Sequence, residues 1–183
     1  MPHISNLRRS RGYNFEKSIV DWFNSQDGYI SRRLGGSSTG LPDIVTTHNE
    51  TGTIYTIEAK SVTGNLAYIP LDQVERCLDV LKMFDYYKNK WMWFAFKFGI
   101  NKTNYQGKKN KTNEKTKFYF YKVTLIANLK SIRFVSCNYN GELSLMKHED
   151  SIDTPYMEAW QYTKLNDLLV ENASKRTKQA TLI

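Results

Sequence analysis

The sequence predicts an α/β fold, with a central mixed β-sheet flanked by helices. Two segments carry apolar residues at helical spacing, and the segments around them are rich in the aromatic and β-branched residues typical of strands. Hydrophobic residues make up 40% of the chain and charged residues 24%, a globular composition. A chain of 183 residues can bury a core without disulfides or zinc, so one domain is the default expectation.

Two helices are predicted on either side of a strand-rich stretch. The first covers residues 13–25, where the apolar residues at helical spacing are Phe15, Ile19, Trp22 and Phe23. Asp27 and Gly28 then mark a turn. The second helix begins at Pro70, a residue favoured in a first helical turn, and its repeating apolar residues are Val74, Leu78 and Leu81.

The strand candidates follow the composition and alternation expected of a sheet. They are residues 29–34, 43–47, 53–60, 91–98, 117–126 and 132–137. We expect these strands to complete one mixed sheet. The stretch from Gly35 to Gly40 is predicted to be a loop because it consists of Gly, Ser and Thr.

The strands 43–47 and 53–60 are predicted to form a hairpin that carries the chemistry. A tight turn centred on Glu50 and Thr51 sets Asp43 directly across from Glu58. Opposed residues have Cβ atoms about 5 Å apart, so the two carboxylates repel unless a cation lies between them. Lys60 lies two residues beyond Glu58, on the same face, where its ammonium can orient water or stabilise charge on a phosphate.

The donor set indicates a hard divalent cation. Oxygen ligands without His or Cys suit Mg²⁺, with Mn²⁺ as a substitute, and such ions support phosphodiester hydrolysis. Glu16 borders the apolar face of the first helix and can reach the sheet. The plainer alternative is that Asp43 is a turn residue after Pro42 and that Glu58 and Lys60 form a solvated edge pair.

Several motifs together resemble the archaeal Holliday junction resolvases, within the PD(D/E)xK nuclease superfamily. They are Arg11 to Glu16, residues 33–38, Pro42-Asp43-Ile44-Val45, Ile57-Glu58-Ala59-Lys60-Ser61 and residues 68–75. The resemblance runs over residues 8–84 and more loosely over 91–126. It implies a restriction-endonuclease-like nuclease core, with Glu16, Asp43 and Glu58 as metal ligands, Lys60 as the catalytic lysine, and Ser37 as a hydroxyl that hydrogen-bonds a phosphate.

The charge of the chain agrees with a nucleic-acid partner. Its 26 Lys and Arg against 18 Asp and Glu give a net charge of +8, which favours polyanions through counterion release. The candidates for DNA binding are Arg8, Arg9, Arg11, Arg32, Arg33 and Gln73. The expected activity is resolution of four-way junction DNA by metal-dependent hydrolysis with paired symmetric nicks, and the resemblance implies a homodimer with two equivalent active sites.

The predicted organisation is a nuclease domain over residues 1–130 and a C-terminal extension over 131–183, packed in part on the core and ending in a basic tail. A short helix is expected around Leu165 to Val170. The lysine-rich stretch 101–117 is either a flexible insert or a phosphate-gripping loop. The last five residues, 179–183, resemble the start of a peptide that binds a sliding clamp, although the closing aromatic pair is missing.

Three alternatives stay open at this stage. A restriction or repair nuclease of the same superfamily would share the metal site, and a noncatalytic DNA-binding module would share the basic surface. An RNA-binding module would use the aromatic residues of 91–94 and 118–121 as stacking faces. Only two cysteines, far apart, and no signal-like apolar segment predict a cytoplasmic, nucleoid-associated protein that is not secreted.

Overall fold

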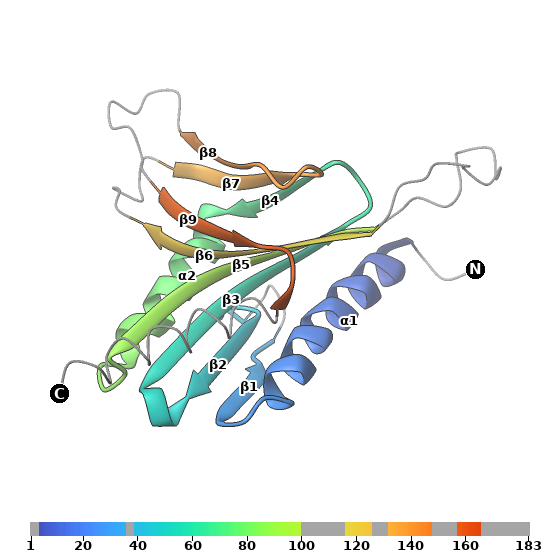
Figure 1. Cartoon of the computed structure of the whole chain (residues 1–183). Coiled ribbons are helices and arrows are strands. Elements are labelled where there is room, and N and C mark those ends of the chain that lie inside the picture. Colours follow the sequence, from blue (N-terminus) through green and yellow to red (C-terminus); the bar gives the residue numbers. More distant parts are fainter. Residues whose placement is uncertain (1–3, 36–38, 100–115, 126–131, 148–156, 166–183) are drawn as a thin grey trace, which may run out of the picture.

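The computed structural model describes residues 4–35, 39–99, 116–125, 132–147 and 157–165. Within these ranges the chain forms an α/β structure (Figure 1). The elements are α1 (Ile4–Asn24), β1 (Tyr29–Arg33), β2 (Ile44–His48), the 3-10 turn η1 (Asn49–Thr51), β3 (Thr53–Val62), β4 (Leu66–Pro70), α2 (Leu71–Met83), β5 (Asn89–Phe98), β6 (Lys117–Leu125), β7 (Ile132–Asn138), β8 (Leu143–Lys147) and β9 (Met157–Tyr162).

The main sheet is mixed, as predicted. Its strand order is β1-β2-β3-β5-β6-β9, and only the β3–β5 pair is parallel. A parallel pair needs a crossover connection, and here β4 and α2 provide it. Strand β3, which carries Glu58 and Lys60, is therefore held near the centre of the sheet, between β2 and β5.

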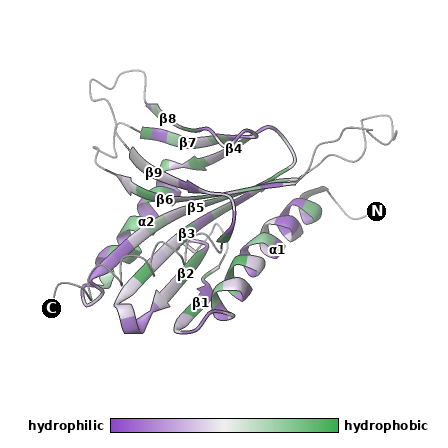
Figure 2. Ribbon diagram, viewed as in Figure 1, coloured by the Kyte–Doolittle hydropathy of each residue, from purple (hydrophilic) through white to green (hydrophobic). Residues whose placement is uncertain are grey.

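The two faces of the main sheet have separate apolar cores. On one face α1 packs against β1 to β3, with Phe15, Ile19 and Phe23 buried against Ile57 and Trp93. On the other face, α2 and the small second sheet cover β3, β5 and β6, through buried residues that include Val74, Cys77 and Leu81. Figure 2 shows hydrophobic and hydrophilic residues interspersed along α1, as an amphipathic helix requires.

The predicted start of the first helix was wrong, because α1 begins at Ile4 rather than Tyr13. The added turns contain Arg8, Arg9 and Arg11. Leu7, the large apolar residue of these turns whose exposure is described, is half exposed. This part of α1 contributes little to the core, so it lacks the apolar spacing by which a helix is found in a sequence.

The prediction that residues 132–137 belong to the same sheet was also wrong. They form β7, which pairs with β4 and β8 in a separate three-stranded sheet of order β4-β7-β8. Strands β4, β8 and β9 were not predicted. Residues 131–183 thus contribute β7 and β8 to the second sheet, while β9 pairs with β6 at the edge of the main sheet.

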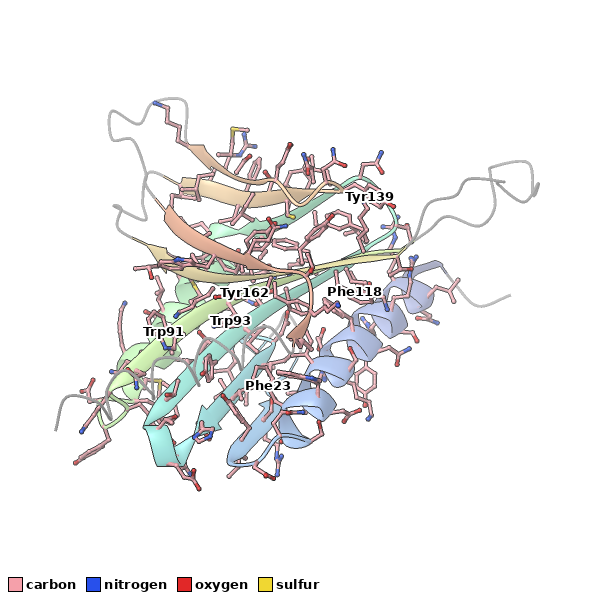
Figure 3. All side chains as sticks on the ribbon, in the orientation of Figure 1. Phe23, Trp91, Trp93, Phe118, Tyr139 and Tyr162 are labelled. Atoms are coloured by element: carbon pink, nitrogen blue, oxygen red, sulfur yellow. The ribbon has the colours of Figure 1, made fainter. Side chains whose placement is uncertain are left out.

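The aromatic runs mostly fill the interior. Trp93, Phe94, Phe120 and Tyr121 are buried, and Trp93 stacks on Tyr162 of β9 with ring centroids 6.0 Å apart (Figure 3). Phe118 is the most exposed member of these runs that was proposed for stacking on bases. Most of the aromatic faces are therefore already occupied by protein.

Other predictions fall partly or wholly outside the described residues. These are nearly all of the lysine-rich stretch 101–117, the helix expected after Leu165, the basic tail and the clamp-like terminus. Neither helix of the described part of the chain is long and apolar enough to cross a membrane.

Candidate active site

The β2–β3 hairpin brings Asp43 beside Glu58. Ile44 pairs with Ile57, so the next residues outward are Asp43 and Glu58, which confirms the register predicted from the turn. Asp43 directly precedes β2, and its Oδ2 accepts a 2.9 Å hydrogen bond from the backbone N–H of Ala59. The carbonyl of Asp43 accepts a second bond, 3.0 Å long, from the N–H of Leu34 at the end of β1. The residue is thus held from both sides.

Glu58 is a carboxylate buried in the middle of the sheet. It is 2% exposed, and its Oε1 accepts a 2.6 Å hydrogen bond from Nζ of Lys60. Burial raises the pKa of Glu58 to about 7; Lys60 opposes this rise and the neighbouring Asp43 adds to it. Near neutral pH the Asp43–Glu58 pair is therefore reluctant to carry two negative charges, and a cation between them would relieve the repulsion.

Glu16 reaches the same region from α1. Its carboxylate is bonded by Nε of Arg33 at the end of β1, and the Arg33 guanidinium lies over the ring of Tyr13 at 5.0 Å from the centroid. Burial raises the pKa of Glu16, the bond to Arg33 lowers it, and the charge of Asp43 raises it. The charge of Asp43 therefore acts on Glu16, but the side chain that Glu16 contacts directly is Arg33.

A pocket of about 820 Å³ connects these groups. Its walls come from α1, the end of β1, the start of β2, the centre of β3 and the first turns of α2. The lining residues are Asn6, Arg9, Ser10, Gly12, Tyr13, Glu16, Arg33, Asp43, Ala59, Lys60, Gln73 and Arg76. Glu58 is reached through its contact with Lys60.

The structure brings some of the predicted site residues together and leaves others apart. Glu16, Asp43 and Lys60 line the pocket, as do Arg9, Arg33 and Gln73 from the predicted DNA-binding set. The other three members of that set, Arg8, Arg11 and Arg32, do not. Arg11 bonds the carbonyl of Leu7 and Arg32 that of Ser31. Ser37, the predicted phosphate-binding hydroxyl, lies outside the described residues.

Besides Gly12 and Ala59, four pocket residues, all with polar side chains, were not predicted as site residues: Asn6, Ser10, Tyr13 and Arg76. On α1, positions 6, 10 and 13 precede Glu16 at intervals of three and four, so all share one helix face. This spacing would have identified three of the four once α1 was extended to Ile4. Arg76 depends on how α2 packs across the sheet, which no local pattern indicates.

The donor chemistry fits a hard cation held by two carboxylates. The part of the chain that the structure describes contains no group of three or more His, Cys, Asp or Glu side chains that could hold a metal ion. Asp43 and Glu58 form a carboxylate pair, and the carboxylate of Glu16 forms a salt bridge with Arg33. Mg²⁺ is commonly bound through one or two carboxylates and keeps several waters, so a pair is a sufficient donor set.

Comparison with known families decides the relationship. The model of the family described as archaeal Holliday junction resolvase (hjc) matches residues 7–133, well over half of the chain and all of the pocket residues except Asn6. The chain belongs to the archaeal Holliday junction resolvase family. The resemblance noted from the sequence motifs is thereby confirmed, and the matched segment ends within β7.

The resolvase family is also represented among similar solved structures. One is the 1.6 Å structure of the Holliday junction resolvase Hjc from Archaeoglobus fulgidus, with 21% sequence identity and a TM-score of 0.39. The match covers 57% of the present chain and 72% of the A. fulgidus chain. A search of curated proteins gave no match.

Proposed function

We propose that this resolvase-family chain is a divalent-metal-dependent endonuclease that cuts four-way DNA junctions by phosphodiester hydrolysis, placing paired symmetric nicks. The observation that carries the proposal is the Asp43–Glu58 carboxylate pair with Lys60 at one wall of a pocket that arginines also line. Membership of the resolvase family gives the expected substrate. The net charge of +8 supports a polyanionic partner.

Asp43 and Glu58 would hold Mg²⁺, or Mn²⁺ in its place, and when bound the ion would lower the pKa of a water and neutralise charge on the phosphate. Asp43 is pre-positioned by its bond from Ala59. Glu58 is fixed by β3 and by Lys60. Glu16 is proposed as a further ligand, and its bond to Arg33 would have to open for it to reach a cation.

Lys60 has the most accessible charge beside the carboxylate pair. Its side chain is 23% exposed, against 2% for that of Glu58, so the ammonium lies between the buried acid and the pocket. From this place it can donate to a phosphate oxygen or orient an attacking water while one N–H stays on Glu58. We assign Lys60 the role of catalytic lysine, and Ser37 the role of a phosphate-binding hydroxyl.

The proposed substrate also suggests the oligomeric state of the protein. A four-way junction is cut at two symmetry-related positions, and each chain carries one Asp43–Glu58 pair, so we propose a homodimer with two equivalent sites. We also propose that the protein acts in the cytoplasm, on the DNA of the nucleoid. Contact of residues 179–183 with a sliding clamp remains a prediction.

The test compares labelled four-way junction, duplex and single-stranded DNA with purified protein in Mg²⁺ or EDTA. Asp43→Asn is the active-site variant, and the matched control is Asp27→Asn in the exposed turn after α1. Cutting restricted to the junction, lost in EDTA and in Asp43→Asn but kept in Asp27→Asn, supports the proposal. Equal cutting of duplex would favour a restriction or repair nuclease, and tight binding without cutting would favour a noncatalytic module.

A further inference from the structure

The first turns of α2 give the pocket a wall on which the sequence predicted Gln73 but not Arg76. Gln73 and Arg76 are three residues apart on this helix, so they share a face, and both line the pocket with Asp43 and Lys60. The Oε1 atom of Gln73 is buried and has no hydrogen-bond donor within the described part of the chain. Because both residues line the pocket, this wall is polar.

Arg76 is oriented by a neighbour that lies outside the pocket. Its NH2 atom bonds Oδ2 of Asp72, one helical turn earlier, at 2.6 Å. The Arg76 side chain is 22% exposed and that of Asp72 57% exposed, and only Arg76 lines the pocket. Exposed helix pairs of this type contribute only about 0.3–0.5 kcal/mol to stability. The contact is better suited to aiming the guanidinium than to stabilising α2.

Two of the other pocket cations contact acids of the proposed site. Lys60 contacts Glu58, and Arg33 contacts Glu16, so both charges are balanced by carboxylates of the site itself. Asp72, which bonds Arg76, belongs neither to the Asp43–Glu58 pair nor to the pocket lining. A guanidinium has five N–H donors in a planar fork, so it can bond a phosphate while one N–H stays on Asp72.

We propose that Arg76 binds a backbone phosphate of the DNA strand that enters the pocket, and that Asp72 positions its guanidinium. This inference rests on the proposed function, since it requires DNA in the pocket. It makes α2 a phosphate-binding wall in addition to the arginine-bearing wall formed by α1 and β1.

The test uses the full chain with junction DNA and no Mg²⁺, so that binding is measured without cutting. The variants are Arg76→Ala, Arg76→Lys and Asp72→Asn. A matched control lies on the same helix: Lys82 pairs with Asp79 at 2.8 Å, both side chains are well exposed, and neither lines the pocket. Lys82→Ala thus removes one positive charge from α2 without touching the site, and thermal unfolding confirms that each variant is folded.

The expected result is a salt dependence with one phosphate contact fewer. The slope of log K against log salt becomes shallower by about 0.9 in Arg76→Ala and is unchanged in Lys82→Ala. Arg76→Lys keeps the charge but loses the fork, so its affinity lies between wild type and Arg76→Ala. Asp72→Asn weakens binding less than Arg76→Ala does.

Single neutral methylphosphonates along the strand then identify the phosphate. At one position the neutral linkage should weaken wild-type binding and leave Arg76→Ala unaffected, because the partner charge is already gone. Equal slopes and affinities for Arg76→Ala and Lys82→Ala, with wild type binding and cutting the junction, would overturn this inference alone. Failure of the wild type to bind or cut junctions would overturn the proposed function, and with it this inference.

Discussion

Oδ2 of Asp43 accepts a hydrogen bond from the backbone N–H of Ala59, the residue between Glu58 and Lys60. This single contact ties the residue before β2 to the centre of β3, and it sets one candidate metal ligand beside the other. The side chain of Asp43 thus has two separable roles, as a charge in the pocket and as an acceptor that fixes the hairpin.

The two roles predict different effects for two substitutions. Asp43→Asn keeps an oxygen that accepts from Ala59, so it should unfold close to the wild-type temperature while cutting is at least about 100-fold slower. Asp43→Ala also loses the hydrogen bond and should be less stable by about 1 kcal/mol. Single-turnover rates and thermal unfolding measure both effects. Substantial cutting by Asp43→Asn would contradict the assigned role.

Lys60 should affect cutting more than binding. Lys60→Met removes the ammonium that touches Glu58 and keeps most of the side-chain volume. We expect cutting to fall by at least about 100-fold, because a pre-positioned donor to the phosphate is lost. Junction affinity should change by less than about 10-fold, as for one phosphate contact. The control is Lys90→Met, because Lys90 also lies on the sheet and contacts an acid, the exposed Asp85. An equal loss of cutting in Lys90→Met would argue against a specific role for Lys60.

Because the pKa of buried Glu58 is raised, the stability of the metal-free protein should depend on pH. The folded pKa of Glu58, about 7, lies above the ordinary glutamate pKa of 4.5 that applies to the unfolded chain. The folded state therefore binds the proton more tightly, and this stabilising contribution is complete below about pH 4.5 and lost as the pH rises through about 7.

The measurement is the unfolding temperature of wild type and Glu58→Gln in EDTA between pH 4.5 and 8. The amide does not titrate, so the wild type should lose stability relative to Glu58→Gln as the pH rises. Glu75→Gln, at an exposed position of α2, is the comparison and should show no such trend. A constant difference between wild type and Glu58→Gln would show that Glu58 does not hold its proton in the folded state.

Because β9 is part of the main sheet, we expect the C-terminal region to stabilise the folded protein. Strand β9 pairs with β6, so removing residues 157–183 turns β6 into an edge strand with unpaired backbone groups. We expect a lower unfolding temperature and a greater tendency to aggregate. A shorter deletion of residues 166–183 keeps β9 whole, and the difference between the two truncated proteins isolates its contribution. Equal stability would mean that the β6–β9 pairing is dispensable.

Local patterns predicted the part of the site that depends on adjacent strands. The turn at Glu50 and Thr51 determines the register of β2 and β3, and that register alone brings Asp43 beside Glu58. The position of Glu16 at the border of the apolar face of α1 was likewise visible, because helical periodicity fixes which residues share a face.

Long-range pairing could not be predicted in the same way. The composition of β7 marks a strand but not its partner, and β4, with which it pairs, lies far away in the sequence. Strand β4 ends at Pro70, directly before the helix, and was hidden by the helix-start pattern. The pairing of Glu16 with Arg33 and the place of Arg76 in the pocket also require the packed structure.

The most direct measurement uses a supercoiled plasmid with an extruded cruciform, which presents one four-way junction in otherwise ordinary duplex. With Mg²⁺, the wild-type protein should convert it to a linear product through two nicks at symmetric positions that DNA ligase can seal, while the same plasmid without the cruciform stays intact. Cutting of both plasmids at equal rates, or of neither in Mg²⁺ or Mn²⁺, would contradict a metal-dependent junction resolvase.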